Sequence, residues 1–472
     1  DKVIISLPEN TESTVTDTVT GTDGNDELTA AIFAKCDLSV NGTGTLNVNA
    51  NANDGITSED KLKITGGVLN ITSADDGLVG KDAVLIKDGT VHITASGNGI
   101  KSTKSEADKG YVYIGGGTVN ITAEQDGIQA ETSVLISAGE VNVTAGGGSA
   151  NGEQKTGNAM FGGAQSTTTD ETLSTKGIKA EAALDITGGT VTVDSADDSL
   201  HSNDSMTVSG GGITVKSGDD GLHADNTLTI EDGTIVVEES CEGLEAFDLT
   251  INGGTIDVTA SDDGLNAAGS SVDGGFGTAG ADTLTVNGGT LTVNASGDGL
   301  DSNGALTING GTVYVSGPTG DGNGTFDCDG VFTINGGVVL GTGSSGMLKT
   351  PTADSKQNTI SVSCTGNVGD TVEVKGADGN TLVSAVAPKS FTNVMFSTPD
   401  ITEGETYTVY VNGTEAASET CSGVVSGATG MGSFGGGPGN MGGQAPNGGM
   451  GGQMPNGNGG TPPQMPGNTS DT

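Results

Sequence analysis

A unit of 22 residues repeats along most of the chain. Ser205–Ala224 is one copy, with the sequence Ser-Met-Thr-Val-Ser-Gly-Gly-Gly-Ile-Thr-Val-Lys-Ser-Gly-Asp-Asp-Gly-Leu-His-Ala. In this copy Gly221 precedes the apolar Leu222. The copies are aligned on this position, which is occupied by Gly55, Gly77, Gly99, Gly127, Gly177, Ser199, Gly221, Gly243, Gly264 and Gly299. A fixed period of this length is typical of a solenoid, in which each unit buries its apolar face against its neighbours.

Each unit contains three short segments that alternate apolar and polar residues. In the copy above they are Met206–Val208, Ile213–Val215 and Leu222–Ala224, and such alternation predicts three strands. A leucine-rich repeat has a similar period, but its outer side needs helix formers, and these units consist of Gly, Thr, Val, Asp and Asn. We therefore predict an all-β fold, a right-handed parallel β-helix with three strands per coil, in which Gly-Gly and Asp-Asp-Gly form two corners.

The repeat divides the chain into four predicted regions. They are irregular opening coils at 1–37 that continue a truncated N-terminus, the β-helix at 38–356, an antiparallel β cap at 357–426 and a disordered Gly/Met/Pro/Asn-rich tail at 427–472. Three insertions interrupt the coils: Thr103–Gly110, Gly146–Lys176 and Ala268–Asp282. The cap is predicted from two hairpin turns, at Asp378–Asn380 and Asn412–Gly413, and from five strand-like segments: Thr359–Ser363, Thr371–Lys375, Thr381–Val386, Val394–Phe396 and Thr406–Val411. It would cover the last coil, whose edge would otherwise recruit another chain.

Composition excludes several classes of protein. The 84 Gly, 3% aromatic residues and lack of Trp rule out an ordinary globular interior. The net charge of -43 argues against nucleic acid and anionic membranes as partners and favours bound cations. No run of 18 apolar residues is present, so no membrane insertion is expected. The five Cys fit neither a metal-binding spacing nor a compact disulfide framework.

Acidic residues precede the aligned glycine in most units. They are Asp75, Asp76, Asp126, Asp197, Asp198, Asp219, Asp220, Glu242, Asp262, Asp263 and Asp298. Adjacent coils lie about 4.8 Å apart, and two carboxylates at that distance repel by about 0.9 kcal/mol in water and about 3.5 kcal/mol at an effective dielectric of 20. An ion between coils would relieve this repulsion. Oxygen ligands without a Cys or His set nearby favour calcium over zinc. The alternative is that each Asp only stabilises a tight turn through its local backbone.

A second set of candidates follows the buried residue of the third strand. Alternation places these side chains on one outward row: Lys101, Lys179, His201, His223, Glu245, Asn266 and Asp301. Hydrogen-bonding groups at a fixed spacing beside a cation site suit an acidic sugar chain. The alternative is a solvated strand face without a ligand.

The repeated Leu-X-Ile-X-Gly-Gly-Thr-Val-X-Val…Asp-Asp-Gly-Leu-X-Ala unit, the later segment Gly317–Gly330 and the Ser-Thr-Pro-Asp stretch ending at Asp400 carry a resemblance to a known family. Over residues 1–420 the chain resembles the pectate-lyase-like, parallel β-helical carbohydrate-binding domains of bacterial surface proteins. The resemblance implies bound calcium and binding, rather than established cleavage, of cell-wall polysaccharide. It also implies a further N-terminal segment, in keeping with the expected truncation.

We therefore expect a secreted or cell-surface, calcium-containing monomer that binds polysaccharide, with acidic pectin-like glycans favoured. One alternative is a calcium-dependent polysaccharide lyase that cleaves uronates by β-elimination. Its base would be a Lys or His because arginine is absent, and nearby carboxylates would raise the pKa of a lysine. A second alternative is a structural adhesin or spacer stalk.

Overall fold

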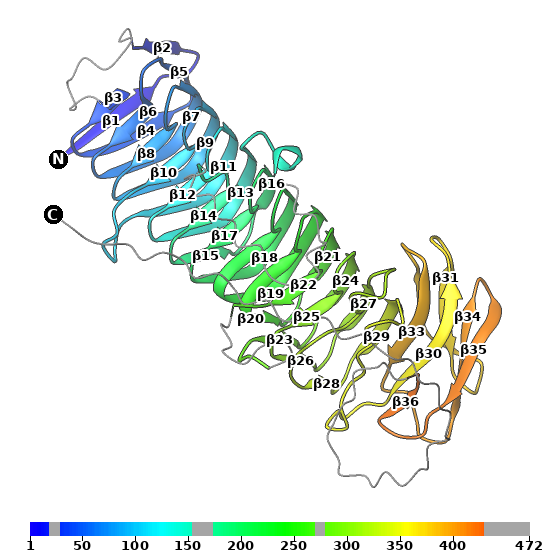
Figure 1. Ribbon diagram of the computed structural model, residues 1–472. Helices are drawn as coiled ribbons and strands as arrows, with labels where there is room; N and C mark the ends of the chain where they lie inside the picture. The colour runs from blue at the N-terminus through cyan, green and yellow to red at the C-terminus, as the bar shows by residue number, and fades with distance from the viewer. Residues whose placement is uncertain (18–28, 153–172, 270–278, 429–472) are drawn as a thin grey trace, which may run out of the picture. The chain divides into compact units, whose positions relative to one another are not determined.

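The strands stack in parallel, with one step of the stack for each coil, and confirm the predicted β-helix (Figure 1). The computed structural model describes residues 1–17, 29–152, 173–269 and 279–428. Residues 1–432 form one compact unit. The predicted tail at 427–472 lies, from residue 429 onward, outside the described residues. Within the described ranges, no helix has the length and hydropathy needed to cross a membrane.

Three columns of strands make up the coils. Several strands continue round a corner and belong to two columns: β7 (Lys61–Ser73), β9 (Ala83–Ala95), β11 (Tyr111–Ala123), β13 (Ser133–Ala145), β18 (Ser205–Ser217) and β20 (Leu244–Ile251). The longest strand, β19 (Leu222–Glu239), contributes to all three columns. The separate first strands are β1 (Lys2–Leu7), β4 (Asp37–Gly42), β15 (Ala183–Ile186), β23 (Thr283–Val286), β26 (Ala305–Ile308) and β28 (Phe332–Ile334).

The second and third columns are built in the same way. Separate second strands are β2 (Glu12–Thr16), β5 (Thr45–Ala50), β16 (Thr190–Ser195), β21 (Thr255–Ala260), β24 (Thr290–Ala295), β27 (Thr312–Ser316) and β29 (Val338–Gly343). Separate third strands are β3 (Ala30–Ala34), β6 (Asp54–Ser58), β8 (Leu78–Gly80), β10 (Ile100–Ser102), β12 (Ile128–Ala130), β14 (Ile178–Ala180), β17 (Leu200–Ser202), β22 (Leu265–Ala267) and β25 (Leu300–Ser302). A single 3-10 helix, Ser149–Asn151, interrupts the strands of the described ranges.

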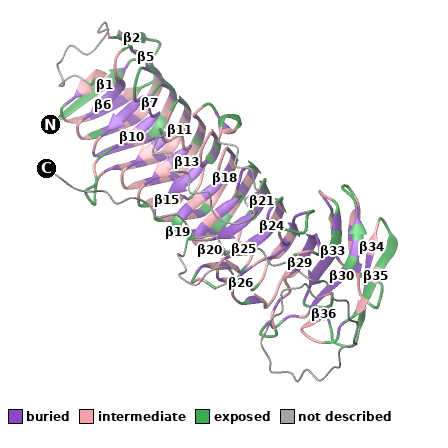
Figure 2. Cartoon of the chain, viewed as in Figure 1, coloured by how far each residue is buried: buried purple, intermediate pink, exposed green. Residues whose placement is uncertain are grey.

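The core is a ladder of aliphatic side chains inside the coils. Ile86, Ile114 and Ile136 are register partners on successive coils, and each is completely buried. Figure 2 shows buried residues alternating with half-buried and exposed ones along the stacked strands. This alternation is what period-2 side-chain direction requires of a strand with one face in the core, so the sequence periodicity directly sets which residues reach the surface.

Glycine forms the corner between the first and second strands, as predicted. Gly254 has φ +84°, in the left-handed region that side chains rarely adopt, and a Cβ there would lie 2.8 Å from the carbonyl oxygen of Gly233 on the preceding coil. Both the backbone conformation and the close approach of the neighbouring coil therefore require glycine at this position.

The opening residues stack on the coils that follow. β1 pairs in parallel with β4, and β3 pairs with β6 so that Ile32 lies beside Ile56. Ile32–Ala34 thus occupies the third-strand position of the opening coils. The insertion at Thr103–Gly110 connects β10 to β11, and its Lys104 and Lys109 both contact Oδ1 of Asp82, at 2.6 and 3.2 Å. The insertions at Gly146–Lys176 and Ala268–Asp282 lie partly outside the described residues.

A C-terminal cap covers the last coil. Its strands β30 (Thr359–Gly366), β33 (Phe391–Ser397) and β36 (Val425–Gly427) extend the large sheet, while β31 (Thr371–Lys375), β32 (Thr381–Val386), β34 (Thr406–Val411) and β35 (Thr414–Thr420) form an antiparallel sheet. β33 pairs antiparallel with β29, so the edge of the last coil is covered as predicted. The strands β35 and β36 were not predicted.

Candidate functional site

The acid directly before the aligned glycine, which we call the inner acid, bonds the backbone of the next coil at six corners. The amide of Asn98 donates to Oδ1 of Asp76 at 2.8 Å, and the amide of Asp220 donates to Oδ1 of Asp198 at 3.1 Å. Equivalent bonds join Asp126 to Lys176, Asp220 to Glu242, Asp263 to Asp298 and Asp298 to Gly324. In these units the carboxylate therefore bonds the next coil, and not only its local turn as the alternative to a metal site supposed, and this bond occupies one carboxylate oxygen.

The two acids of a doubled corner have different environments. Asp76, Asp198 and Asp220 are buried, whereas Asp75 is exposed. The other outer acids, Asp197, Asp219 and Asp262, are half-buried, as are Glu242, Asp263 and Asp298. A doubled acid thus provides one interior carboxylate for the ladder and one carboxylate nearer to solvent.

The inner acids and the outward third-strand residues meet in one array, which we call the charged row. Lys101 Nζ lies 3.0 Å from Asp76 Oδ2. Further along, Nδ1 of His201 is 2.8 Å from Asp198 Oδ2, and the amide nitrogen of Asn266 donates to Oε2 of Glu242 at 2.8 Å. The outward residues are consequently buried or half-buried against the acids, so the two predicted sets of residues lie together in one array.

Lysine ammonium groups neutralise the N-terminal half of the charged row. Lys176 Nζ lies 2.9 Å from Asp197 Oδ1 and 2.7 Å from Asp198 Oδ2. Burial opposes the charge of Lys176, but Asp198 and Asp197 outweigh it and raise the lysine pKa to about 12. Burial also opposes ionisation of Asp198, yet the His201 hydrogen bond and the Lys176 charge hold its pKa well below the usual range. Lys179 pairs with Glu181 at 3.0 Å.

The C-terminal half of the charged row gathers carboxylates instead. Asp263, Asp298 and Asp301 form no ion pair with a basic side chain of the described ranges. Burial, followed by mutual repulsion, raises the pKa of Asp263 to about 9 and that of Asp301 to about 7. For Asp298 burial is again the largest cause, and its pKa rises to about 8. This end of the row therefore gathers carboxyl groups whose ionisation is disfavoured, and Lys349, whose Nζ lies 3.9 Å from Asp327 Oδ1, is the basic side chain that reaches it within the described ranges.

Oxygen atoms of Asp298, Asp301 and Asp327 all lie within 4.8 Å of one another. Asn266 pairs in register with Asp301 on the adjacent coil, and its side chain is 8% exposed. Its Oδ1 is buried without a hydrogen-bond partner among the described residues. Carboxylate and amide oxygens in this arrangement match the ligands that calcium takes in proteins. Asp327 directly follows the buried Phe326, which pairs with Leu300 of the preceding coil, so it continues the outward row by one more coil.

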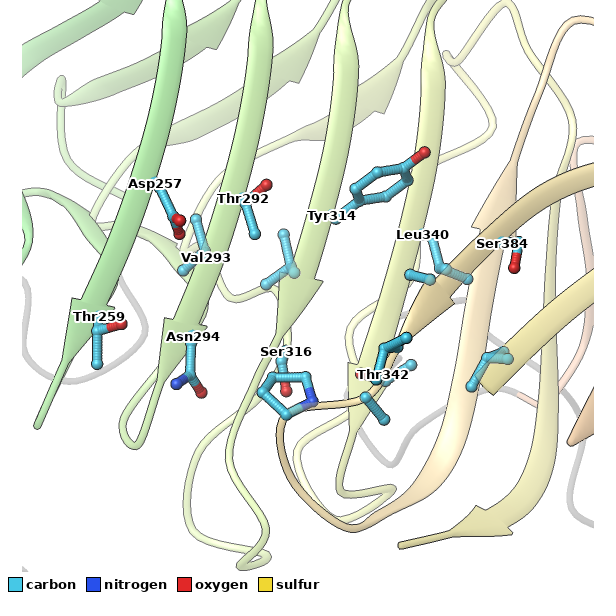
Figure 3. A pocket seen from close by; sticks show the side chains of 16 residues that line it. Asp257, Thr259, Thr292, Val293, Asn294, Tyr314, Ser316, Leu340, Thr342 and Ser384 are labelled. Atoms are coloured by element: carbon cyan, nitrogen blue, oxygen red, sulfur yellow. The ribbon is translucent and has the colours of Figure 1, made fainter. Parts of the chain in front are cut away.

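The outward face of the second strands carries two hollows that the sequence interpretation missed. One, of about 460 Å³, lies where the last coils meet the cap (Figure 3). Two rows of register partners form the bottom of this hollow. One row is Asp257, Thr292, Tyr314 and Leu340, and the other is Thr259, Asn294, Ser316 and Thr342. Cap residues from Ser384 to Pro388 form its wall. The sequence signal that could have predicted this surface is the set of polar residues at alternate positions of these strands.

The second hollow, of about 390 Å³, lies on the same column nearer the N-terminus. It is lined by His92, Asn120, Asn142 and Thr192, which are register partners, and by the parallel row Thr94, Thr122, Thr144 and Asp194. Amide ladders run along this column and beside it, as at Asn142 to Asn120 and Asn309 to Asn287. The column therefore presents a regular polar surface separate from the charged row.

Comparison with known proteins agrees with this repeated architecture. No curated protein and no solved structure matches the chain significantly. The model of one family, described as carbohydrate-binding domain-containing protein, matches residues 1–221 and again residues 220–402. Together the two matches cover well over half of the chain, so it belongs to this family of carbohydrate-binding domain-containing proteins.

Proposed function

We propose that the protein binds acidic, pectin-like polysaccharide through calcium held at the C-terminal half of the charged row. The cluster of Asp298, Asp301 and Asp327 beside the unpartnered amide oxygen of Asn266 is the observation that supports this proposal. Calcium takes six to eight oxygen ligands. Four side chains that each give one oxygen would leave positions open, and a glycan carboxylate could fill them.

Charge gives a physical reason for a bridging ion. The chain carries a net charge of -43, so a polyanionic glycan is repelled unless a cation lies between the two. In the N-terminal half the ammonium groups of Lys101 and Lys176 already occupy the inner acids. We therefore restrict the proposed calcium to the coils after Glu242. Cell-wall glycans lie outside the cell, so the proposal includes a secreted or surface-displayed protein.

The same contacts favour binding over cleavage. A lyase needs a base that is neutral at working pH, and the carboxylates around Lys176 raise its pKa to about 12. Lys101 and Lys179 are held in ion pairs with Asp76 and Glu181. Lys176 is thus a poor candidate for the base, and the ion pairs of the three lysines neutralise carboxylates along the row.

Co-sedimentation with calcium polygalacturonate tests the proposal, with unsaturated product followed by absorbance in the same samples. The parent protein should pellet with the polymer in calcium and remain in solution with chelator, without product formation. Asp301→Asn should weaken pelleting, whereas Tyr314→Ala, in the hollow of Figure 3, should not. Loss through Tyr314→Ala alone would move the glycan site to the second-strand face. Product formation would establish a lyase, and no pelleting by the parent would refute the proposal.

A further inference from the structure

Two histidines in the middle of the charged row have acceptor atoms at both ring nitrogens. His201 Nε2 lies 2.7 Å from Oδ1 of Asn203, whose amide nitrogen is used by Glu181. His223 Nε2 lies 3.4 Å from Oδ1 of Asp225. The Asn203 oxygen accepts, so Nε2 of His201 carries a hydrogen, and the Asp225 carboxylate favours the same tautomer in His223. In each ring, Nδ1 then points a lone pair at a carboxylate. Two acceptors cannot bond each other, so either a second proton on the ring or a cation must lie between them.

Several carboxylates converge on Nδ1 of His223. Oδ2 of Asp220 lies 3.0 Å away and Oε2 of Glu245 lies 3.5 Å away, while Oδ2 of Asp198 is at 4.0 Å. A single proton on Nδ1 can bond one of these oxygens well. A divalent cation between His223, Asp220 and Glu245 contacts all three ligands at once and offsets the charge that Glu242 adds beside Glu245.

The spacing fits a small transition-metal ion. Zinc binds nitrogen and carboxylate oxygen at about 2.0–2.2 Å, so tetrahedral ligand atoms lie about 3.3–3.6 Å apart. The two distances from His223 Nδ1, 3.0 and 3.5 Å, require little adjustment. Asp225 contacts Nε2, the ring nitrogen of His223 that would not bind the metal. A carboxylate at this second nitrogen commonly orients a metal-binding histidine. Imidazole also favours such metals over calcium, which takes oxygen ligands.

We propose that Asp220, His223 and Glu245 form a binding site for a zinc-class divalent metal, with Asp225 orienting the imidazole. The site is distinct from the oxygen-only calcium site proposed above, and it stands whether or not the protein binds glycans. Folding brings His223 of the outward row against Asp220 and Glu245, so at this point a nitrogen ligand joins the oxygen ligands from which calcium was predicted.

Cobalt(II) titration of the chelator-treated full chain tests this site, because intense visible d–d absorption reports a tetrahedral coordination sphere of the kind that zinc adopts. The parent should gain this absorption with one equivalent, release protons, and lose the signal to zinc but not to excess calcium. His223→Ala should abolish it. Asp225→Asn, at an exposed position, should weaken binding by roughly 10- to 100-fold.

His92→Ala is the matched control, since His92 is exposed on the second-strand column and the parent signal should be retained. Circular dichroism and melting of every variant establish that it is folded. Absence of the band in the parent, its persistence in His223→Ala, or equal displacement by calcium would each overturn the proposal. In the first case His223 would hold a second proton rather than a metal.

Discussion

Lys176 acts as a cation built into the corner, and replacing it with methionine should measure what that cation contributes. Its side chain is 16% exposed and contacts Asp197 and Asp198 on the next coil. Methionine keeps much of the apolar stem and removes the charge. Asp198, with a side chain 4% exposed, would then be left against His201 without its ammonium partner.

The expected loss of stability can be estimated in two ways. The lysine pKa of about 12, against 10.5 for a free lysine, corresponds to about 2 kcal/mol. Removing one partner of a buried pair typically costs about 3–5 kcal/mol. We therefore expect Lys176→Met to lower the unfolding free energy by about 2–5 kcal/mol.

The pH window of this difference follows from both partners. The lysine pKa is raised on folding, so its contribution is full below pH 10.5 and is lost as the pH rises through about 12. The pKa of Asp198 is lowered, so its contribution is full above pH 3.8 and is lost at more acidic pH. The difference between parent and variant should be constant between these limits.

Urea denaturation in chelator at pH 7, followed by circular dichroism, measures the loss. Lys81→Met is the control, because Lys81 and Glu59 form a surface pair with both side chains 37% exposed, and such pairs contribute about 0–1 kcal/mol. Calcium should stabilise Lys176→Met more than the parent, since oxygens of Asp197, Asp198 and Asp219 lie within 4.8 Å of one another. A loss no larger than that of Lys81→Met would contradict the assigned role of Lys176.

Three further predictions follow from the coils and the cap. Because burial raises the pKa of Asp301 to about 7, the folded protein favours the protonated form of this carboxyl. In chelator the melting temperature should therefore fall as the pH rises from 4 to 8. Asp301→Asn should make this fall smaller, and calcium should also reduce it by binding the ionised form. Gly254→Ala should cost more than about 1 kcal/mol because of its positive φ, whereas Gly212→Ala, with nothing within 4 Å of the added Cβ, should leave urea midpoints nearly unchanged. Truncation after residue 356 removes β33 from the edge of β29 and should cause self-association visible by light scattering; a monodisperse truncated chain would show that the cap has another role.

The period of the sequence predicted the coils well because one local rule repeats. β31, β32 and β34 were also predicted with the bounds that they have in the structure, since alternation and hairpin turns are local signals. The bond from Asp198 to the amide of Asp220 could not be predicted in this way, because it depends on how two corners stack. The role of Lys176 could have been predicted, because it directly precedes Gly177, at the position where most other units have an acidic residue. The orientation of the Asn266 amide, by contrast, depends on the position of Glu242 in three dimensions.

The ladder of inner acids makes the coils interchangeable in construction. Each such coil ends in a carboxylate that accepts the amide of its successor, and itself offers an amide to its predecessor. A duplicated or deleted unit of 22 residues therefore leaves a donor facing an acceptor at the new junction. Length can change by whole coils without new chemistry at the joint, so gene-level duplication gives a simple route by which a chain of this kind grows or shortens.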